Sequence, residues 1–297
     1  MNNIYKYLFK ALFLILVLFL NNSFIYAQNI ASDSFENPQL FWKPKLEYAF
    51  TKTFSSSHEF SACQVFQCLD YNLAEITQIR RITPFPASLT VEFDGIEEAY
   101  LPVKTDDNSV STQTRVLKFK KLDVICDKVH YFDMEIERMT FGFPDSVIEY
   151  DYLDKGRLKF VSASKIDLLV KVSENDLLSV LNLYPRAKAL SNVKIILTPN
   201  QCQSKGRVKL GFLVAEYKIK GFIKQVSPKI IDFSCSKLTI NGITQPRAFV
   251  KTIMSYINPV FDSSKVWINL NISSMNIIKG YVMTNAVINK KEIKNAN

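Results

Sequence analysis

The stretch Arg207-Val-Lys-Leu-Gly-Phe-Leu-Val-Ala-Glu-Tyr-Lys-Ile-Lys-Gly-Phe-Ile-Lys224 decides the fold class of this chain of 297 residues. Apolar and polar side chains alternate along it, as where Tyr217 and Ile219 are set against Lys218 and Lys220. A period of two residues is typical of a β-strand with one face buried and one face in water. The stretch therefore predicts antiparallel strands whose lysines lie on the solvent face.

The same alternation returns in four other segments. They are Leu89–Phe93, Leu122–Cys126, Phe132–Ile136 and Ile268–Ile272. Short segments rich in Asp, Asn, Gly and Pro separate the runs, which is typical of turns between antiparallel strands. We therefore expect a long antiparallel sheet to make up most of the fold.

Three segments have the period of an amphipathic helix instead. Apolar residues recur at helical spacing over Ala62–Ile79, after a polar lead-in that contains prolines. A short helix is predicted after the capping residues Ser173–Asp176, and a third helix over Pro246–Pro259. A sheet with one apolar face must close on itself or pack against helices. The expected fold class is therefore α+β, with a long curved antiparallel sheet packed around amphipathic helices.

The N-terminus has the composition of a secretory signal. Lys6 and Lys10 precede the apolar run Ala11–Leu20, and the small residue Ala27 suits a signal peptidase. The run is short for a bilayer span of about 20 residues. We expect an exported, periplasmic or envelope-associated protein with a signal peptide (1–27), an N-terminal extension that holds the first helix (28–86), a main domain (87–289) and a basic tail (290–297).

Charge is distributed unevenly along the chain. Residues 28–150 carry 12 basic and 19 acidic side chains, whereas residues 151–297 carry 23 basic and 9 acidic side chains. A half this basic attracts anionic partners over a Debye length of about 10 Å. Export argues against nucleic acid and leaves anionic lipid, acidic polysaccharide or the acidic half of the chain itself as partners. The alternative is that the lysines only occupy the solvent faces of strands.

The five cysteines allow at most two disulfide bonds within one chain. If their segment is helical, Cys63 and Cys68 are too far apart to bond, because their Cα atoms exceed the limit of about 7 Å. Cys126 and Cys235 fall on the apolar sides of their strands and are predicted to be buried free thiols. No cysteine has metal-site spacing with either histidine, so we expect no metal and no cofactor.

Several stretches carry a family resemblance. They are Ile166–Leu181, Arg207–Val214, Glu216–Lys224, Phe233–Ile243, the motif Ile257-Asn-Pro-Val-Phe-Asp262, Val266–Ile272 and Lys279–Tyr281. Over about Ala87–Ala286, this order of elements resembles the LmeA-like phospholipid-binding family. The resemblance implies an exported envelope protein that binds phospholipid without chemistry, with a shape related to tubular lipid-binding folds.

The family offers no catalytic residues to transfer to this chain. Asn258, Pro259, Asp262 and Gly280 match motif positions, and we expect them to set turns and a helix stop rather than to contact a ligand.

A lipid site needs an apolar groove and a basic rim. Each buried methylene contributes about 0.8 kcal/mol, so an acyl chain in a groove would bind well, although ordinary core packing would use the same residues. The predicted groove residues are Phe249, Ile253, Met254, Ile257, Phe261, Trp267 and Phe212. The predicted headgroup rim consists of Lys205, Arg207, Lys209, Lys218, Lys220 and Lys224.

The sequence thus predicts a protein that binds, or binds and shuttles, a phospholipid or another anionic amphiphile, with peripheral contact to a membrane. The alternative is a structural or adhesive envelope protein whose sheet face meets other proteins or acidic polymers. An enzyme is not expected, because the sequence lacks a nucleophile elbow, a zinc motif and a phosphate-binding glycine loop. Only Asp145, Glu149, Asp151 and Asp154 suggest a glycan-cleaving pair, and their spacing is typical of turns.

Overall fold

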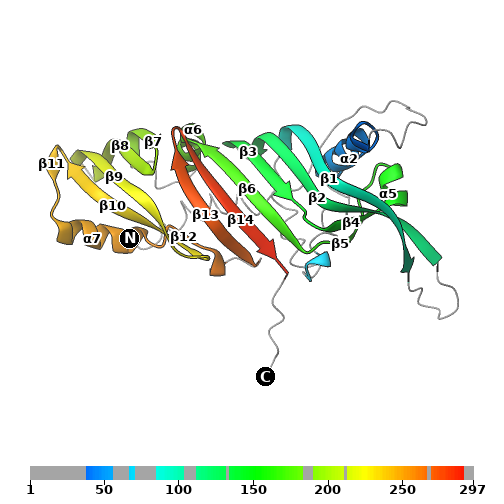
Figure 1. Ribbon diagram of the computed structural model, residues 1–297. Helices are drawn as coiled ribbons and strands as arrows, with labels where there is room; N and C mark the ends of the chain where they lie inside the picture. Colours follow the sequence, from blue (N-terminus) through cyan, green and yellow to red (C-terminus); the bar gives the residue numbers. More distant parts are fainter. Residues whose placement is uncertain are drawn as a thin grey trace, which may run out of the picture. The chain divides into compact units, whose positions relative to one another are not determined.

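The computed structural model of the protein describes residues 38–55, 67–70, 85–103, 112–131, 134–182, 190–210, 213–265 and 269–290 (Figure 1). The predicted signal peptide, most of the helix predicted over Ala62–Ile79 and nearly all of the basic tail lie outside these residues. Antiparallel strands make up most of the described chain, and a few helices accompany them. The prediction of an α+β fold is therefore confirmed at this level.

The helices are α2 (Pro38–Ser55), α5 (Tyr150–Asp154), α6 (Glu174–Asn182), α7 (Arg247–Ile257) and the short 3-10 helix η2 (Ser263–Lys265). The first strands are β1 (Phe85–Val103), β2 (Thr112–Tyr131), β3 (Met134–Gly142), β4 (Ser146–Glu149), β5 (Phe160–Ser162) and β6 (Lys165–Ser173). The later strands are β7 (Leu190–Thr198), β8 (Gln201–Leu210), β9 (Leu213–Ser227), β10 (Ile230–Ile240), β11 (Ile243–Thr244), β12 (Phe261–Asp262), β13 (Leu270–Ile278) and β14 (Tyr281–Asn289).

Within the described residues these strands form two sheets. The larger sheet has the hydrogen-bonded order β13-β14-β6-β3-β2-β4-β5, with β1 paired to β2. The smaller sheet has the order β11-β10-β9-β8-β7, with β12 paired to β10. Buried and half-buried residues alternate strictly along β6 and β14, which is the pattern of strands with one face in the core.

The chain divides into two compact units, which we describe separately. Among the described residues, the first unit holds those of His130–Met139 and Leu169–Val287. The second unit holds the described residues up to Val129, together with Thr140–Leu168 and those from Ile288 onward.

The second unit contains α2, a helix that the sequence does not predict. Pro44 lies inside α2 and costs a helix about 3 kcal/mol. Trp42, Leu46, Ala49 and Phe50 recur at helical spacing, and each is at most 4% exposed. Full burial of a large apolar side chain contributes about 1.5–3 kcal/mol. Burial of this stripe therefore outweighs the cost of the proline.

Polar side chains of α2 also bind the neighbouring strand β1. Gln39 Nε2 donates to the carbonyl oxygen of Phe93 at 2.7 Å, and the backbone N–H of Val91 donates to Glu47 Oε1 at 3.1 Å. Val91 is completely buried and Phe93 nearly so. Helix α2 is thus an integral part of the core of the second unit (Figure 1).

The helix predicted over Ala62–Ile79 is interrupted in its described part. Gln67 and Cys68 are helical, whereas Leu69 and Asp70 form a turn. Asp70 has a φ of 65°, which a right-handed helix does not contain. The prediction of an uninterrupted helix is therefore wrong at Asp70, whose N–H donates to the carbonyl oxygen of Gln67 at 3.0 Å and closes a turn that contains the buried Leu69.

The two other predicted helices are confirmed in the first unit. Ser173 Oγ accepts a hydrogen bond from the N–H of Asp176 at 3.2 Å, and Asp176 Oδ2 accepts one from the N–H of Ser173 at 2.6 Å. This reciprocal pair is a capping box, and it begins α6. Pro246 is the N-cap of α7, and Asn258 ends that helix immediately before Pro259.

Candidate functional site

The candidate site lies in the first unit, on the smaller sheet. Residues directly opposite each other on antiparallel strands project to the same face. The register pairs Ser204 of β8 with Ile219 of β9, and Ile219 with Leu238 of β10. The register thus places a set of mostly apolar residues on one face of the sheet, which we call the apolar face. It includes Leu197, Cys202, Ile219, Ile223, Phe233 and Leu238.

Burial varies along the apolar face. Leu197 of β7 is 2% exposed and forms a buried cluster with Ile277 of β13 and Val282 of β14. In contrast, Ile219 and Phe233 farther along the same face are only half-buried. The apolar face is therefore buried around Leu197 and, on β10, at Ile231 and Leu238, whereas it is less completely covered at Ile219 and Phe233.

Polar contacts hold the backbone of Leu197 at the buried end of the apolar face. Glu174, the first residue of α6, accepts a hydrogen bond from the backbone N–H of Leu197 at 2.5 Å through Oε1. The N–H of Gly280 in the β13–β14 turn donates to the carbonyl oxygen of Leu197 at 3.0 Å. Gly280 has a φ of 81°, so it sets the turn that its motif position predicts.

Two aromatic rings lie against glycines on the apolar face. A Cβ atom on Gly221 would lie 2.5 Å from Cζ of Phe233, and a Cβ atom on Gly206 would lie 3.2 Å from Cε1 of Tyr217. The rings therefore occupy the space that side chains would take at these positions. The two rings therefore cover the glycine positions of the apolar face with aromatic surface.

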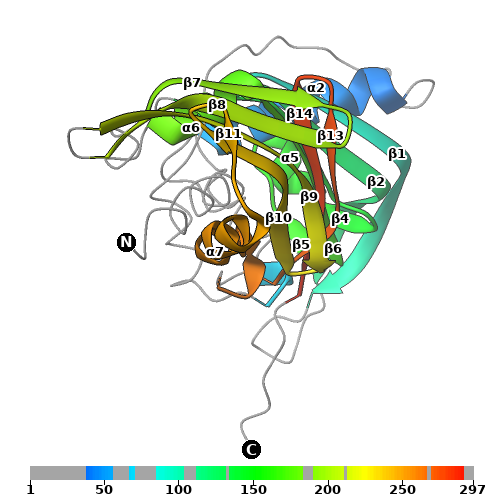
Figure 2. The same ribbon diagram turned by 90° about the vertical axis from the view of Figure 1, so that its left-hand side faces the viewer.

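Helix α7 lies against β10, on the side toward which the smaller sheet curves (Figure 2). Two hydrogen bonds from one side chain hold the end of the helix there. Asn258 Oδ1 accepts from the N–H of Phe233 at 2.8 Å, and Asn258 Nδ2 donates to the carbonyl oxygen of Phe233 at 3.0 Å. Asn258 therefore ends the helix, as its motif position predicts, and its two side-chain bonds form a latch to β10 that was not predicted. Asp262 makes a local turn contact to Ser264, as expected.

The predicted groove residues are distributed over α7 and β12. Phe249 of α7 is 42% exposed, Ile253 and Met254 are half-buried, and Phe261 of β12 is 6% exposed and pairs with Ile231 of β10. The side chain of Ile257, and the residues Trp267 and Phe212, lie outside what the structure describes. Ordinary core packing thus accounts for Phe261, whereas Phe249, Ile253 and Met254 are partly exposed, and their part in binding a ligand stays a prediction.

The predicted rim residues all lie on the opposite face of the sheet. They share that face with two lysines that the sequence did not single out, Lys194 and Lys237. We call this the basic face; its basic residues are Lys194, Lys205, Arg207, Lys209, Lys218, Lys220, Lys224 and Lys237. The six predicted residues are therefore neighbours but do not border the apolar face, because successive strand residues point to opposite sides. Their part in binding an anion stays a prediction.

The cysteines described by the structure are free thiols. Cys202 and Cys235 flank Gly221 in one row of the apolar face, and Cys126 lies in the core. Burial raises the pKa of Cys202 to about 11 and that of Cys126 to about 12. Burial also raises the pKa of Cys235, which is half-buried rather than buried as predicted. The neutral thiols of Cys202 and Cys235 add to the apolar character of the site, whereas Cys126 belongs to the core of the second unit, and all three are poor nucleophiles.

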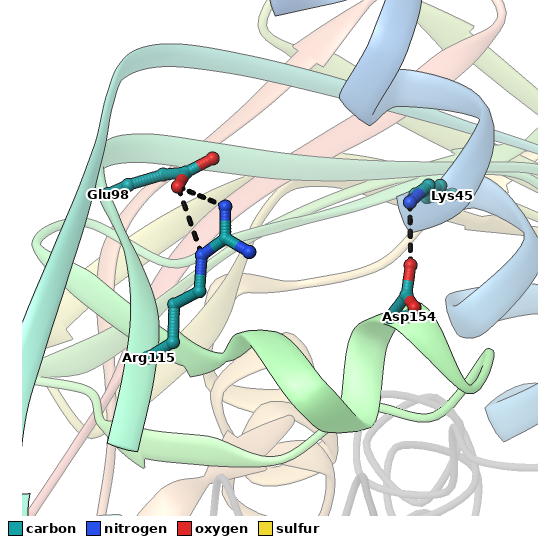
Figure 3. A network of polar contacts seen from close by, with 4 residues as sticks. All are labelled: Lys45, Glu98, Arg115 and Asp154. Atoms are coloured by element: carbon teal, nitrogen blue, oxygen red, sulfur yellow. Dashed lines mark hydrogen bonds and ion pairs between the residues drawn. The ribbon is translucent and has the colours of Figure 1, made fainter. Parts of the chain in front are cut away.

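The acidic cluster of the second unit is engaged in structural contacts. Asp154 of α5 binds Lys45 of α2 at 2.7 Å (Figure 3). Glu149 binds Lys159 at 2.7 Å. Asp145 occupies a turn with a φ of 47°. These positions match the expected turn and surface roles, and they do not strengthen the case for a glycan-cleaving pair.

A second ion pair in Figure 3 joins the two long strands β1 and β2. Arg115 Nε donates to Glu98 Oε2 at 3.1 Å, and the guanidinium lies 3.7 Å from the centre of the Tyr150 ring. The hydrogen bond to Glu98 raises the pKa of Arg115 above its ordinary value. This group stabilises the strand pair and the start of α5.

Within the described residues, His, Cys, Asp and Glu side chains do not gather into a group of three or more that could hold a metal ion. The helices in this part of the chain are too short or too polar to cross a lipid bilayer. Comparisons with protein-family models, with curated proteins and with solved structures give no match.

Proposed function

We propose that the protein binds the acyl chain of a phospholipid, or of a similar amphiphile, on the apolar face of the smaller sheet beneath α7. No bond is made or broken. One observation carries this proposal. Ile219 and Phe233 are only half-buried, although they lie on the same face as Leu197, which belongs to a buried cluster. An exported protein of the cell envelope with a tubular, LmeA-like lipid-binding fold is part of the same proposal.

Burial of an acyl chain supplies the free energy for binding on this face. Each methylene that leaves water contributes about 0.8 kcal/mol, so ten methylenes contribute roughly 8 kcal/mol before ordering costs. Without ordering costs that free energy would correspond to a Kd of about 1 μM, and the ordering costs raise the Kd above this limit. Side-chain entropy would be lost mainly by Met254, whose flexible thioether adapts to chains of different shape.

Helix α7 supplies the other side of the proposed site. Ile253 and Met254 are half-buried next to β10, and Phe249 is exposed one turn earlier. Asn258 holds the C-terminal end of α7, and the pairing of β11 with β10 and the bond from the N–H of Gln245 to the carbonyl oxygen of Leu238 hold the chain that leads into the helix. Entry of an acyl chain between α7 and the sheet would then complete the burial of both surfaces.

Filling the site provides the test. In Ile219→Trp, the larger apolar side chain occupies the surface over β9, and we expect the Kd of a fluorescent fatty acid to rise at least about tenfold. Val214→Trp is the matched control, because Val214 lies on the same strand but on the basic face and is 58% exposed. Its Kd should equal that of the wild type.

Native mass spectrometry of the purified wild-type protein, followed by organic extraction, identifies the ligand. Phospholipid that co-purifies with the wild type and is reduced in Ile219→Trp supports the proposal. Wild-type protein that carries no lipid and binds no fluorescent fatty acid would contradict it. Retained binding of a protein or of an acidic polymer in that case would favour the adhesive alternative.

A further inference from the structure

Lysines occupy directly opposite positions on neighbouring strands of the basic face. Lys194 of β7 pairs with Lys205 of β8, and Lys205 pairs with Lys218 of β9. On the next rows, Lys220 of β9 pairs with Lys237 of β10. Directly opposite Cβ atoms lie about 4.5–5.5 Å apart, and like charges at this separation destabilise a sheet. The arrangement therefore favours an anionic partner over the free surface.

The protein itself does little to neutralise these lysines. Arg207 forms an ion pair with Glu216 on the same face, at 3.0 Å. Within the described residues, none of the five paired lysines forms such an ion pair, and all except the half-buried Lys220 are exposed. The ammonium groups are thus available to a partner outside the fold.

Large apolar side chains stand exposed among these lysines. Phe222 is 45% exposed and lies on the basic face between Lys220 and Lys224. On the same strand, Val214 is 58% exposed on this face, and Val226, at a bulge in the pairing with β10, is 52% exposed. A soluble anion or an acidic polymer would need only the charges. A bilayer interface binds both the lysines and the exposed apolar side chains. The lysines contact the phosphates, while the apolar side chains enter the boundary of the acyl region.

We propose that the basic face docks the protein on membranes that contain anionic phospholipid. The lysine rows supply electrostatic attraction, and Phe222 and Val214 insert into the interface. This inference does not depend on the proposed acyl site, because that site lies on the opposite face of the sheet. It gives the six predicted rim residues a role on the membrane surface instead of at the mouth of a groove.

Vesicle flotation with the full chain tests the proposal. The probes are vesicles of phosphatidylcholine alone and vesicles of equal parts phosphatidylcholine and phosphatidylglycerol. A basic residue near an anionic surface contributes about 1 kcal/mol, which is about a fivefold change in partitioning. The triple change Lys194→Gln, Lys205→Gln and Lys218→Gln should therefore weaken binding to the anionic vesicles on the order of 100-fold.

A matched triple variant removes the same charge elsewhere. Lys128→Gln, Lys155→Gln and Lys279→Gln change exposed lysines outside the basic face, and this variant should bind the anionic vesicles like the wild type. Wild-type binding should also weaken at an ionic strength of about 1 M, where the Debye length is about 3 Å. Equal losses in both triple variants would overturn the proposal, because net charge rather than this face would then decide binding.

Phe222→Ser separates a bilayer from other anionic partners. The change leaves every lysine in place, and we expect it to weaken vesicle binding about tenfold while it leaves retention on a heparin column unchanged. Full vesicle binding by Phe222→Ser would overturn the membrane assignment and indicate an acidic polymer or protein as the partner. Circular dichroism confirms that each variant is folded before it is compared.

Discussion

Replacement of Asn258 by alanine should release α7 from the smaller sheet. The side chain makes two hydrogen bonds to the backbone of Phe233, and both are lost in Asn258→Ala. The backbone bond from the N–H of Asn258 to the carbonyl oxygen of Met254 is retained, so the helix itself still ends at the same residue. At about 1 kcal/mol for each hydrogen bond, opening of α7 becomes easier by about 2 kcal/mol.

Hydrogen–deuterium exchange measured by mass spectrometry reads this local opening directly. A change of 2 kcal/mol raises the opening equilibrium about 30-fold, and exchange of the α7 amides should accelerate by that factor. The α6 amides should not change, because their capping box is untouched. If α7 covers a bound acyl chain, dissociation of a fluorescent fatty acid should accelerate as well.

Lys251→Ala is the control for this experiment. Lys251 lies on α7 and is exposed, so its loss should change stability by no more than about 0.5 kcal/mol. Unchanged exchange of α7 in Asn258→Ala would refute the reasoning, because the latch would then contribute nothing to the position of the helix. Equal acceleration in Lys251→Ala would refute it too, since α7 would then open for reasons unrelated to Asn258.

Three further outcomes follow from contacts in the core. Gly221→Ala places a methyl group against the backbone and an aromatic ring of β10, and it should lower the free energy of unfolding by about 1–3 kcal/mol in urea titrations. Glu174→Gln removes the charge from the side chain that accepts the hydrogen bond of the Leu197 N–H. It should lower the free energy of unfolding by about 1 kcal/mol, which is measured as a lower Tm. Because burial raises the pKa of Cys202 to about 11 and of Cys126 to about 12, above the ordinary value of 9.0, both should resist iodoacetamide near neutral pH. Their contribution to stability is full below pH 9.0 and is lost as the pH rises through those pKa values, which urea titrations across the alkaline range would detect.

The strands and their two faces follow from the sequence because their cause is local. Alternation of Tyr217 and Ile219 with Lys218 and Lys220 depends only on the geometry of an extended chain, and the structure has these residues on opposite faces of β9 as predicted. The cap that begins α6 is equally local, since its partners Ser173 and Asp176 are three residues apart.

Features that join distant segments could not be predicted in the same way. The lysine row from Lys194 through Lys205 to Lys218 depends on the register of three strands, which cross-strand packing selects and no single period reveals. The placement of the rim residues away from the apolar face became visible only with that register. Their spacing in the sequence correctly indicated that they are neighbours.

Local sequence patterns also failed to predict helix α2 and the turn at Asp70. Pro44 argues against a helix, and the apolar spacing over Ala62–Ile79 argues for one. Burial of Trp42 and Leu46 in the core decides the first case, and the buried position of Leu69 in a turn decides the second. The sequence by itself determined where strands run and which of their residues share a face. Tertiary packing decided which strands pair, in which register, and where burial outweighs local preference, because those free energies arise between residues that are distant along the chain.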